Sequence, residues 1–171
     1  GSYPTSYIPT YGSAVTRSGD SSLLSNSSTL PNAYPFSLYA EINVEDLESG
    51  CAISLLDSSD FDIYYSIEYY GGFWRIITRN TTQTIGTSSV VPTLGSHKVL
   101  GIYTETSLSL YLDGALAINV SNGQTFNSNA NDLFVGQLRS VADGGARTSI
   151  KQALVFPTAL TDSECIALTS L

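Results

Sequence analysis

The chain has 171 residues, only 13% of them are charged, and its formal net charge is −8. This length suits one all-β domain with a substantial core. The acidic balance makes nucleic acid an unfavourable partner, because the field of the protein repels a polyanion. No stretch of the sequence is apolar for the length that a bilayer requires, so we expect no membrane insertion. The many hydroxyl and amide side chains are typical of an extracellular or virion-exposed β-protein.

The start of the sequence bears on the domain organisation. The sequence begins Gly1-Ser2 and contains no methionine. We therefore interpret residues 1–171 as a single domain excised from a longer polypeptide, with residues 1–2 as an expression scar.

Cys51 and Cys165 are too few for a disulfide framework, and we expect two separate small apolar residues. A bond between them is the alternative.

The first clear strand is predicted over residues 35–44, PFSLYAEINV. Its alternation has the period of a strand with one face on a core. The residues on that face are Phe36, Leu38, Ala40, Ile42 and Val44. Strands are also predicted at 51–57, 62–70 and 73–80, and Gly71-Gly72 supplies a two-residue hairpin turn between the last two. Within 62–70 one face carries Ile63, Tyr65, Ile67 and Tyr69.

The middle of the chain contains a polar run and then a second hairpin. Residues 81–96 are polar and irregular, and we interpret them as a crossing between two sheets. The runs LSLYL and ALAINV that follow alternate like strands and flank Asp113-Gly114. This pair is favoured in tight hairpins, because both central residues need positive φ.

Two strands and a helix are predicted at the end of the chain. The strands are NDLFVGQL, residues 131–138, and TSIKQALVF, residues 148–156. Alternation in the second places Ile150, Gln152, Leu154 and Phe156 on one side. Thr161 and Glu164 have the spacing of a capping box ahead of CIALTSL, which predicts a short helix. Altogether, about nine to eleven short strands and one closing helix predict an all-β, two-sheet antiparallel jelly-roll sandwich.

Three segments carry a family resemblance. The run SHKVLGIYTETSLSLYLDGALA, residues 96–117, resembles the middle of laminin-G-like, concanavalin A-like domains, where a strand reads roughly "LYVDG". The tail LVFPTALTDSECIAL, residues 154–168, is similar to the last strand and "LSDAE" helix start of the same family. The opening YPTSYIPTYGSAVTRSGD, residues 3–20, resembles an "ATSYIPT…AVTRAAD" segment of such domains in bacteriophage tail and fibre proteins.

The resemblance implies a function as well as a concanavalin A-like fold. It implies a non-catalytic adhesion or carbohydrate-binding module of a phage tail or fibre protein, exposed on the virion. Its partners would be a glycan on the host cell surface and other virion proteins, with homo-oligomers formed through the parent protein. Two alternatives are a purely structural virion module that mediates assembly contacts, and an accessory module of a secreted bacterial enzyme.

Catalytic residues are not expected in this chain. Glycoside hydrolysis needs two carboxyl groups about 5 to 10 Å apart, and the Glu-x-Asp-x-x-Glu string of glucanase relatives is absent. Asp62 and Glu68 fall on one strand face, but six residues is a long separation for a cooperating pair. His97 is the only histidine, and in the resembling family the equivalent histidine does not catalyse. We expect it to be structural.

The predicted ligand site lies at the Gly71-Gly72 turn. Sugar sites combine an aromatic platform with polar groups that fix orientation. The aromatic residues predicted to bind ligand are Tyr69, Tyr70, Phe73 and Trp74. The alternative for Trp74 is burial in the core, whereas the position of Tyr70 and Phe73 beside the turn favours exposure.

No cofactor is expected, although calcium is an open alternative. Asp20, Asp132 and Asp143 lie in polar turns where they could supply oxygen ligands. The simpler interpretation is that each caps its own turn.

Overall fold

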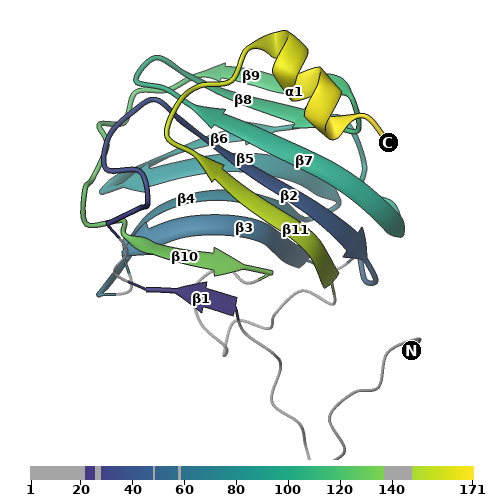
Figure 1. Ribbon diagram of the computed structural model, residues 1–171, viewed down its shortest axis with the longest axis horizontal. Helices are drawn as coiled ribbons and strands as arrows, with labels where there is room; N and C mark the ends of the chain where they lie inside the picture. Colours follow the sequence, from purple (N-terminus) through teal and green to yellow (C-terminus); the bar gives the residue numbers. More distant parts are fainter. Residues whose placement is uncertain (1–21, 26–27, 48, 58, 137–147) are drawn as a thin grey trace, which may run out of the picture.

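The computed structural model describes residues 22–25, 28–47, 49–57, 59–136 and 148–171. These residues form two antiparallel sheets that stack as a sandwich, with one helix outside it (Figure 1). The six-stranded sheet has the order β1 (Ser22–Leu24), β10 (Asp132–Val135), β3 (Ser49–Asp57), β4 (Asp60–Tyr70), β5 (Phe73–Asn80), β6 (Thr82–Thr87). The five-stranded sheet has the order β11 (Thr148–Phe156), β2 (Phe36–Val44), β7 (Gly95–Tyr103), β8 (Ser107–Leu112), β9 (Ala115–Ser121). The predicted jelly-roll sandwich is confirmed.

The main core lies between the two sheets and is formed by the alternating residues predicted for it. The five apolar side chains on one face of β2 are all buried, and so are the four on the predicted face of β4. Phe36 and Tyr103 stack with their ring centroids 4.8 Å apart, and Tyr65 meets Phe36 edge-on at 5.3 Å. These rings fill one end of the core.

Both predicted hairpin turns are present. Gly71 and Gly72 join β4 to β5 with φ of 61° and 82°, and Asp113 and Gly114 join β8 to β9 with φ of 48° and 86°. Positive φ at both central residues is the turn geometry that matches the twist of the flanking strands.

The run 81–96 is more ordered than predicted. Its first part forms β6, an edge strand paired with β5, and only residues 88–94 cross to the other sheet. The apolar alternation that would predict this strand is weak, because the inward position in the middle of β6 is Gly86 rather than an apolar side chain. A Cβ atom at Gly86 would lie 2.5 Å from Cγ2 of Ile118 in β9, so glycine allows the two edge strands to approach closely.

The prediction of which β11 side chains share one face is wrong. The register against β2 shifts between Ile150 and Gln152, which is the mark of a β-bulge. The inserted residue reverses the alternation, so Ile150, Ala153 and Val155 pack on the main core. Leu154 and Phe156 instead pack on a second apolar cluster on the outer face of the sheet.

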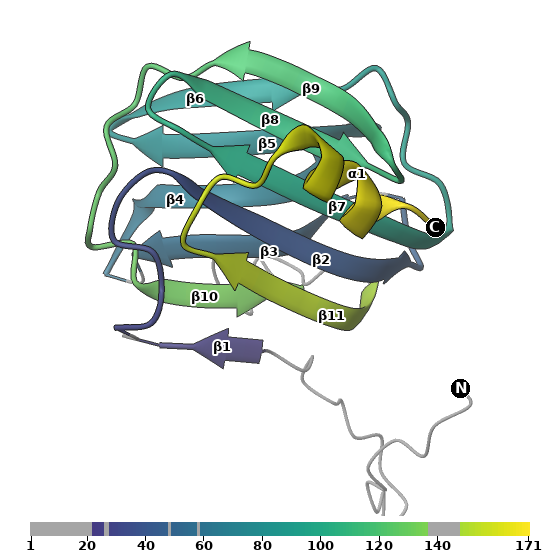
Figure 2. The ribbon, with the colours of Figure 1, turned by 45° about the horizontal axis from the view of Figure 1, so that its top comes forward.

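That second cluster lies beneath α1 (Asp162–Thr169), which crosses the outer face of the five-stranded sheet (Figure 2). Cys165 is buried there, and Tyr111 of β8 donates a hydrogen bond of 2.6 Å to Asp162. Burial, followed by this bond, raises the pKa of Tyr111. Cys51 and Cys165 are both free and buried, as expected.

The predicted capping box is present at the start of α1. Thr161 accepts a hydrogen bond from the Glu164 backbone, and the Glu164 carboxylate accepts one from the Thr161 backbone N–H at 2.8 Å. The bond from the Thr161 backbone N–H, followed by a bond of 2.7 Å from the Thr161 hydroxyl, lowers the pKa of the Glu164 carboxyl group.

Replacing Thr161 with alanine is expected to lower the free energy of unfolding by about 1 kcal/mol at neutral pH, as is usual for the loss of a threonine N-cap. A carboxyl group with a lowered pKa stabilises the fold above its ordinary pKa of 4.5, and this contribution is lost as the pH falls through the folded-state value. Thr161→Ala keeps the backbone bond to the Glu164 carboxylate but removes the hydroxyl bond, so the part of the loss that comes from the hydroxyl bond should shrink in acid. Urea unfolding measures it, with the exposed Thr158→Ala as the matched control; equal losses in the two variants would contradict the cap.

Candidate functional site

The predicted aromatic residues divide into two pairs at the Gly71-Gly72 hairpin. Tyr70 and Phe73 face each other across the turn, on the outer face of the six-stranded sheet. Their side chains are 56% and 41% exposed, as the sequence favoured.

Tyr69 and Trp74 lie on the opposite face, in the main core, with 1% and 0% exposure. They are partners in the register between β4 and β5, and their ring centroids are 5.5 Å apart. Burial raises the pKa of Tyr69 to about 12. The prediction that these two side chains contact ligand is wrong in this structure, because alternation across the hairpin turns both rings inward and leaves no ring face open to a sugar.

A pocket of about 300 Å³ opens on the outer face beside Tyr70. We call it the sheet-face pocket. It is lined by side chains from three neighbouring strands, β4, β5 and β6. They include Tyr64, Glu68, Tyr70, Arg75, Gln83 and Ile85.

Polar and aromatic groups in this pocket hold one another in place. The guanidinium carbon of Arg75 lies 4.7 Å from the centroid of the Tyr70 ring, within the range of a cation–π interaction. Gln83 donates a hydrogen bond of 2.8 Å to the Tyr64 hydroxyl. Glu68 is directly opposite Arg75 in the register of β4 and β5. The pocket thus combines an exposed ring with a cation, a carboxylate and an amide.

Sequence reasoning missed Arg75 and Gln83. Arg75 has the same parity as Phe73 in FWRIITRN, so alternation alone could have placed it on the exposed face. Gln83 carried no such signal, because its strand was interpreted as an irregular crossing.

His97, which the sequence analysis expects to be structural, has partners at both ring nitrogens. It is buried, its Nδ1 is 2.7 Å from Oδ2 of Asp113, and its Nε2 is 2.9 Å from the carbonyl oxygen of Thr93. Both ring nitrogens therefore join the β8–β9 turn to the segment that precedes β7.

Two acidic side chains, Asp57 and Asp62, also have structural partners. Asp62 forms an ion pair of 2.8 Å with Arg79, and Asp57 accepts a bond of 2.8 Å from the backbone of Ser59. Among the described residues, no three His, Cys, Asp or Glu side chains gather closely enough to hold a metal ion. Asp132 is buried in β10, whereas Asp20 and Asp143 lie outside the described residues.

Two stacked antiparallel sheets and a closing helix define a jelly-roll sandwich. Residues 17–165 match the model of the Laminin_G_3 family of the concanavalin A-like lectin/glucanases superfamily. The chain belongs to this family. No curated protein matches the sequence significantly.

Solved structures with low sequence identity share the fold. Domain 4 of AbnA, a GH43 extracellular arabinanase from Geobacillus stearothermophilus in complex with arabinotriose, has a TM-score of 0.73 at 15% identity, over 88% of this chain and 72% of that one. The CBM40 of the Ruminococcus gnavus IT-sialidase has a TM-score of 0.67 at 15% identity, over 82% and 85%. Domains LG4-5 of the mouse laminin alpha1 chain give 0.64 at 13% identity, over 85% and 41%.

Within the described part of the chain, no helix is both long and apolar enough to span a bilayer.

Proposed function

We propose that the chain is a non-catalytic carbohydrate-binding module and that its sheet-face pocket binds a sugar of a host-surface glycan. The observation that carries this proposal is the exposed Tyr70 ring, which Arg75 holds beside the pocket. A sugar ring has an apolar face that stacks on an aromatic side chain and hydroxyl groups that need polar partners. Glu68, Arg75 and Gln83 supply such partners at the same pocket.

The structural neighbours support the same class of ligand. One is described in complex with arabinotriose, and the Ruminococcus gnavus module is also described bound to alpha2,3 sialyllactose. Asp62 is paired with Arg79, and Asp57 accepts a bond from the Ser59 backbone. These structural partners support the non-catalytic part of the proposal.

The proposed setting is the tail or fibre of a bacteriophage, facing outward on the virion. This part depends on the resemblance of residues 3–20, which lie outside the described residues. Other virion proteins would then be partners, and oligomers would form through the parent protein.

The proposal predicts that Tyr70→Ala and Gln83→Ala weaken glycan binding. The loss of a stacked ring should reduce affinity by about tenfold or more, whereas Tyr70→Phe should retain most of it because it keeps the ring. A glycan array identifies the ligand, and calorimetry then compares the variants. Both side chains are exposed, so unfolding free energies should change by less than about 1 kcal/mol.

Leu116→Ala is the matched control for binding. Leu116 is 49% exposed on β9, in the other sheet, so its loss should leave affinity unchanged. Binding that survives both Tyr70→Ala and Gln83→Ala would contradict the assignment of the sheet-face pocket. A wild-type domain that binds no glycan on the array would instead favour the structural alternative.

A further inference from the structure

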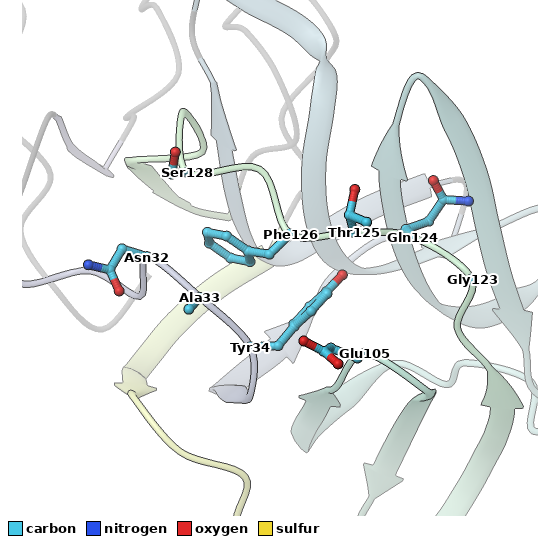
Figure 3. Close-up of a pocket in the computed structure, with 9 residues that line it drawn as sticks. All are labelled: Asn32, Ala33, Tyr34, Glu105, Gly123, Gln124, Thr125, Phe126 and Ser128. Carbon is cyan, nitrogen blue, oxygen red and sulfur yellow. The ribbon is translucent and has the colours of Figure 1, made fainter.

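A second, larger pocket lies among the loops at one end of the sandwich, away from the Gly71-Gly72 turn. Its volume is about 580 Å³, and we call it the loop pocket. It is formed by residues 32–34 before β2, Glu105 between β7 and β8, and residues 123–128 after β9 (Figure 3). Asn80, at the far end of β5 from the turn, donates hydrogen bonds to Thr125 of this pocket.

We propose that the loop pocket is a second saccharide site that is selective for uncharged sugars. The inference goes beyond the sheet-face pocket, because it concerns different residues and specifies the charge of the sugar.

Two aromatic rings form a rigid wall of the loop pocket. Tyr34 and Phe126 meet at 77° with their centroids 5.4 Å apart, and both side chains are half-buried. Phe126 stacks on Tyr65 of the core at 5.2 Å, and the Tyr34 hydroxyl accepts a bond of 3.1 Å from Asn122. Because the rings are held from behind, their open parts are ready to pack against a sugar without reorganisation.

Hydrogen bonds within the loops keep the polar rim in place. Asn122 donates a bond of 2.6 Å to the carbonyl oxygen of Thr104 and accepts one of 3.1 Å from the backbone of Gln124. Asn32, Glu105 and Ser128 are exposed residues of the pocket lining, and Figure 3 draws them together with the two rings. An amide, a carboxylate and a hydroxyl spread around two rings suit a ligand with several hydroxyl groups.

Charge determines which sugars the loop pocket can accept. Glu105 contributes a negative charge, and among the described residues that line the pocket none is a lysine, an arginine or a histidine. An acidic sugar would bring its carboxylate beside Glu105 without a compensating cation, in a protein whose net charge is already −8. The sheet-face pocket differs, because Arg75 lines it.

The test is a nuclear magnetic resonance titration of the nitrogen-15-labelled chain. The neutral probes are lactose, maltotriose and arabinotriose, and the acidic probes are 3′-sialyllactose and a glucuronide disaccharide. At least one neutral probe should shift the backbone amide signals of residues 123–126, and the acidic probes should shift them about tenfold more weakly or not at all. No shift with any neutral probe, or equal shifts with acidic probes, would overturn the proposal.

Variants assign the binding to this pocket rather than to the sheet face. Glu105→Ala should weaken the neutral probe about tenfold, while Glu105→Gln should weaken it less and reduce discrimination against acidic sugars. Gln83→Ala, in the sheet-face pocket, should leave the loop signals unchanged, so each proposal can fail without the other. Shifts with tetramethylammonium but with no sugar would identify a cation site and overturn the inference.

Discussion

Replacing Trp74 with alanine is expected to lower the free energy of unfolding by about 3 to 5 kcal/mol. The side chain is completely buried between the sheets, where it contacts Tyr69 and lies 5.6 Å from the His97 ring. Its removal takes away a large apolar surface and leaves a cavity that the two sheets cannot close. Urea or guanidinium unfolding measures the loss.

Trp74→Phe and Tyr70→Ala are the informative comparisons. Among the described residues, Nε1 of Trp74 has no hydrogen-bond partner, so phenylalanine removes an unsatisfied group and keeps most of the ring. Its cost should be well below that of alanine. A variant Trp74→Ala as stable as Tyr70→Ala would show that the indole does not support the core, contrary to its burial.

Replacing Asp113 with alanine should lower the free energy of unfolding by about 3 kcal/mol, through the loss of bonds that involve a charged group. Oδ2 of Asp113 is 2.7 Å from the buried His97, and Oδ1 accepts a bond of 2.8 Å from the Lys98 backbone. The residue also adopts a φ of 48°, a conformation that aspartate tolerates better than alanine does. Equilibrium unfolding in urea at neutral pH measures the loss.

Asp113→Asn separates the contribution of the charged side-chain bonds from that of the positive φ. Asparagine tolerates positive φ and can still accept from Lys98, so its loss should be smaller than that of alanine. A double-mutant cycle with His97→Ala isolates the energy of the side-chain pair. A coupling energy near zero would contradict the structural role of His97 described above.

The sequence on its own determined the architecture, because the relevant signals are local. Apolar side chains at every second position assign one strand face to the core, as in β2 and in β4. Gly71-Gly72 and Asp113-Gly114 predict hairpins because few residues tolerate positive φ. Thr161 and Glu164 predict the start of α1, because a capping box involves only neighbours in the chain.

Local signals failed where a partner strand decides the geometry. The bulge in β11 appears only in its register with β2, and it changes which side chains face the core. Gly86 looks like a loop residue until Ile118 of β9 is seen beside it. Neither relation is encoded in the period of a single strand.

The candidate sites follow the same division. The sequence located an aromatic cluster at the Gly71-Gly72 turn, and alternation placed Tyr69 on the core face of its strand. The register of β4 with β5 then put Trp74 on the same buried face. The loop pocket combines Tyr34, Glu105 and Phe126, which lie far apart in the chain and share no motif. Only the tertiary structure brings them together, because folding of the two sheets places the ends of different strands at one end of the sandwich.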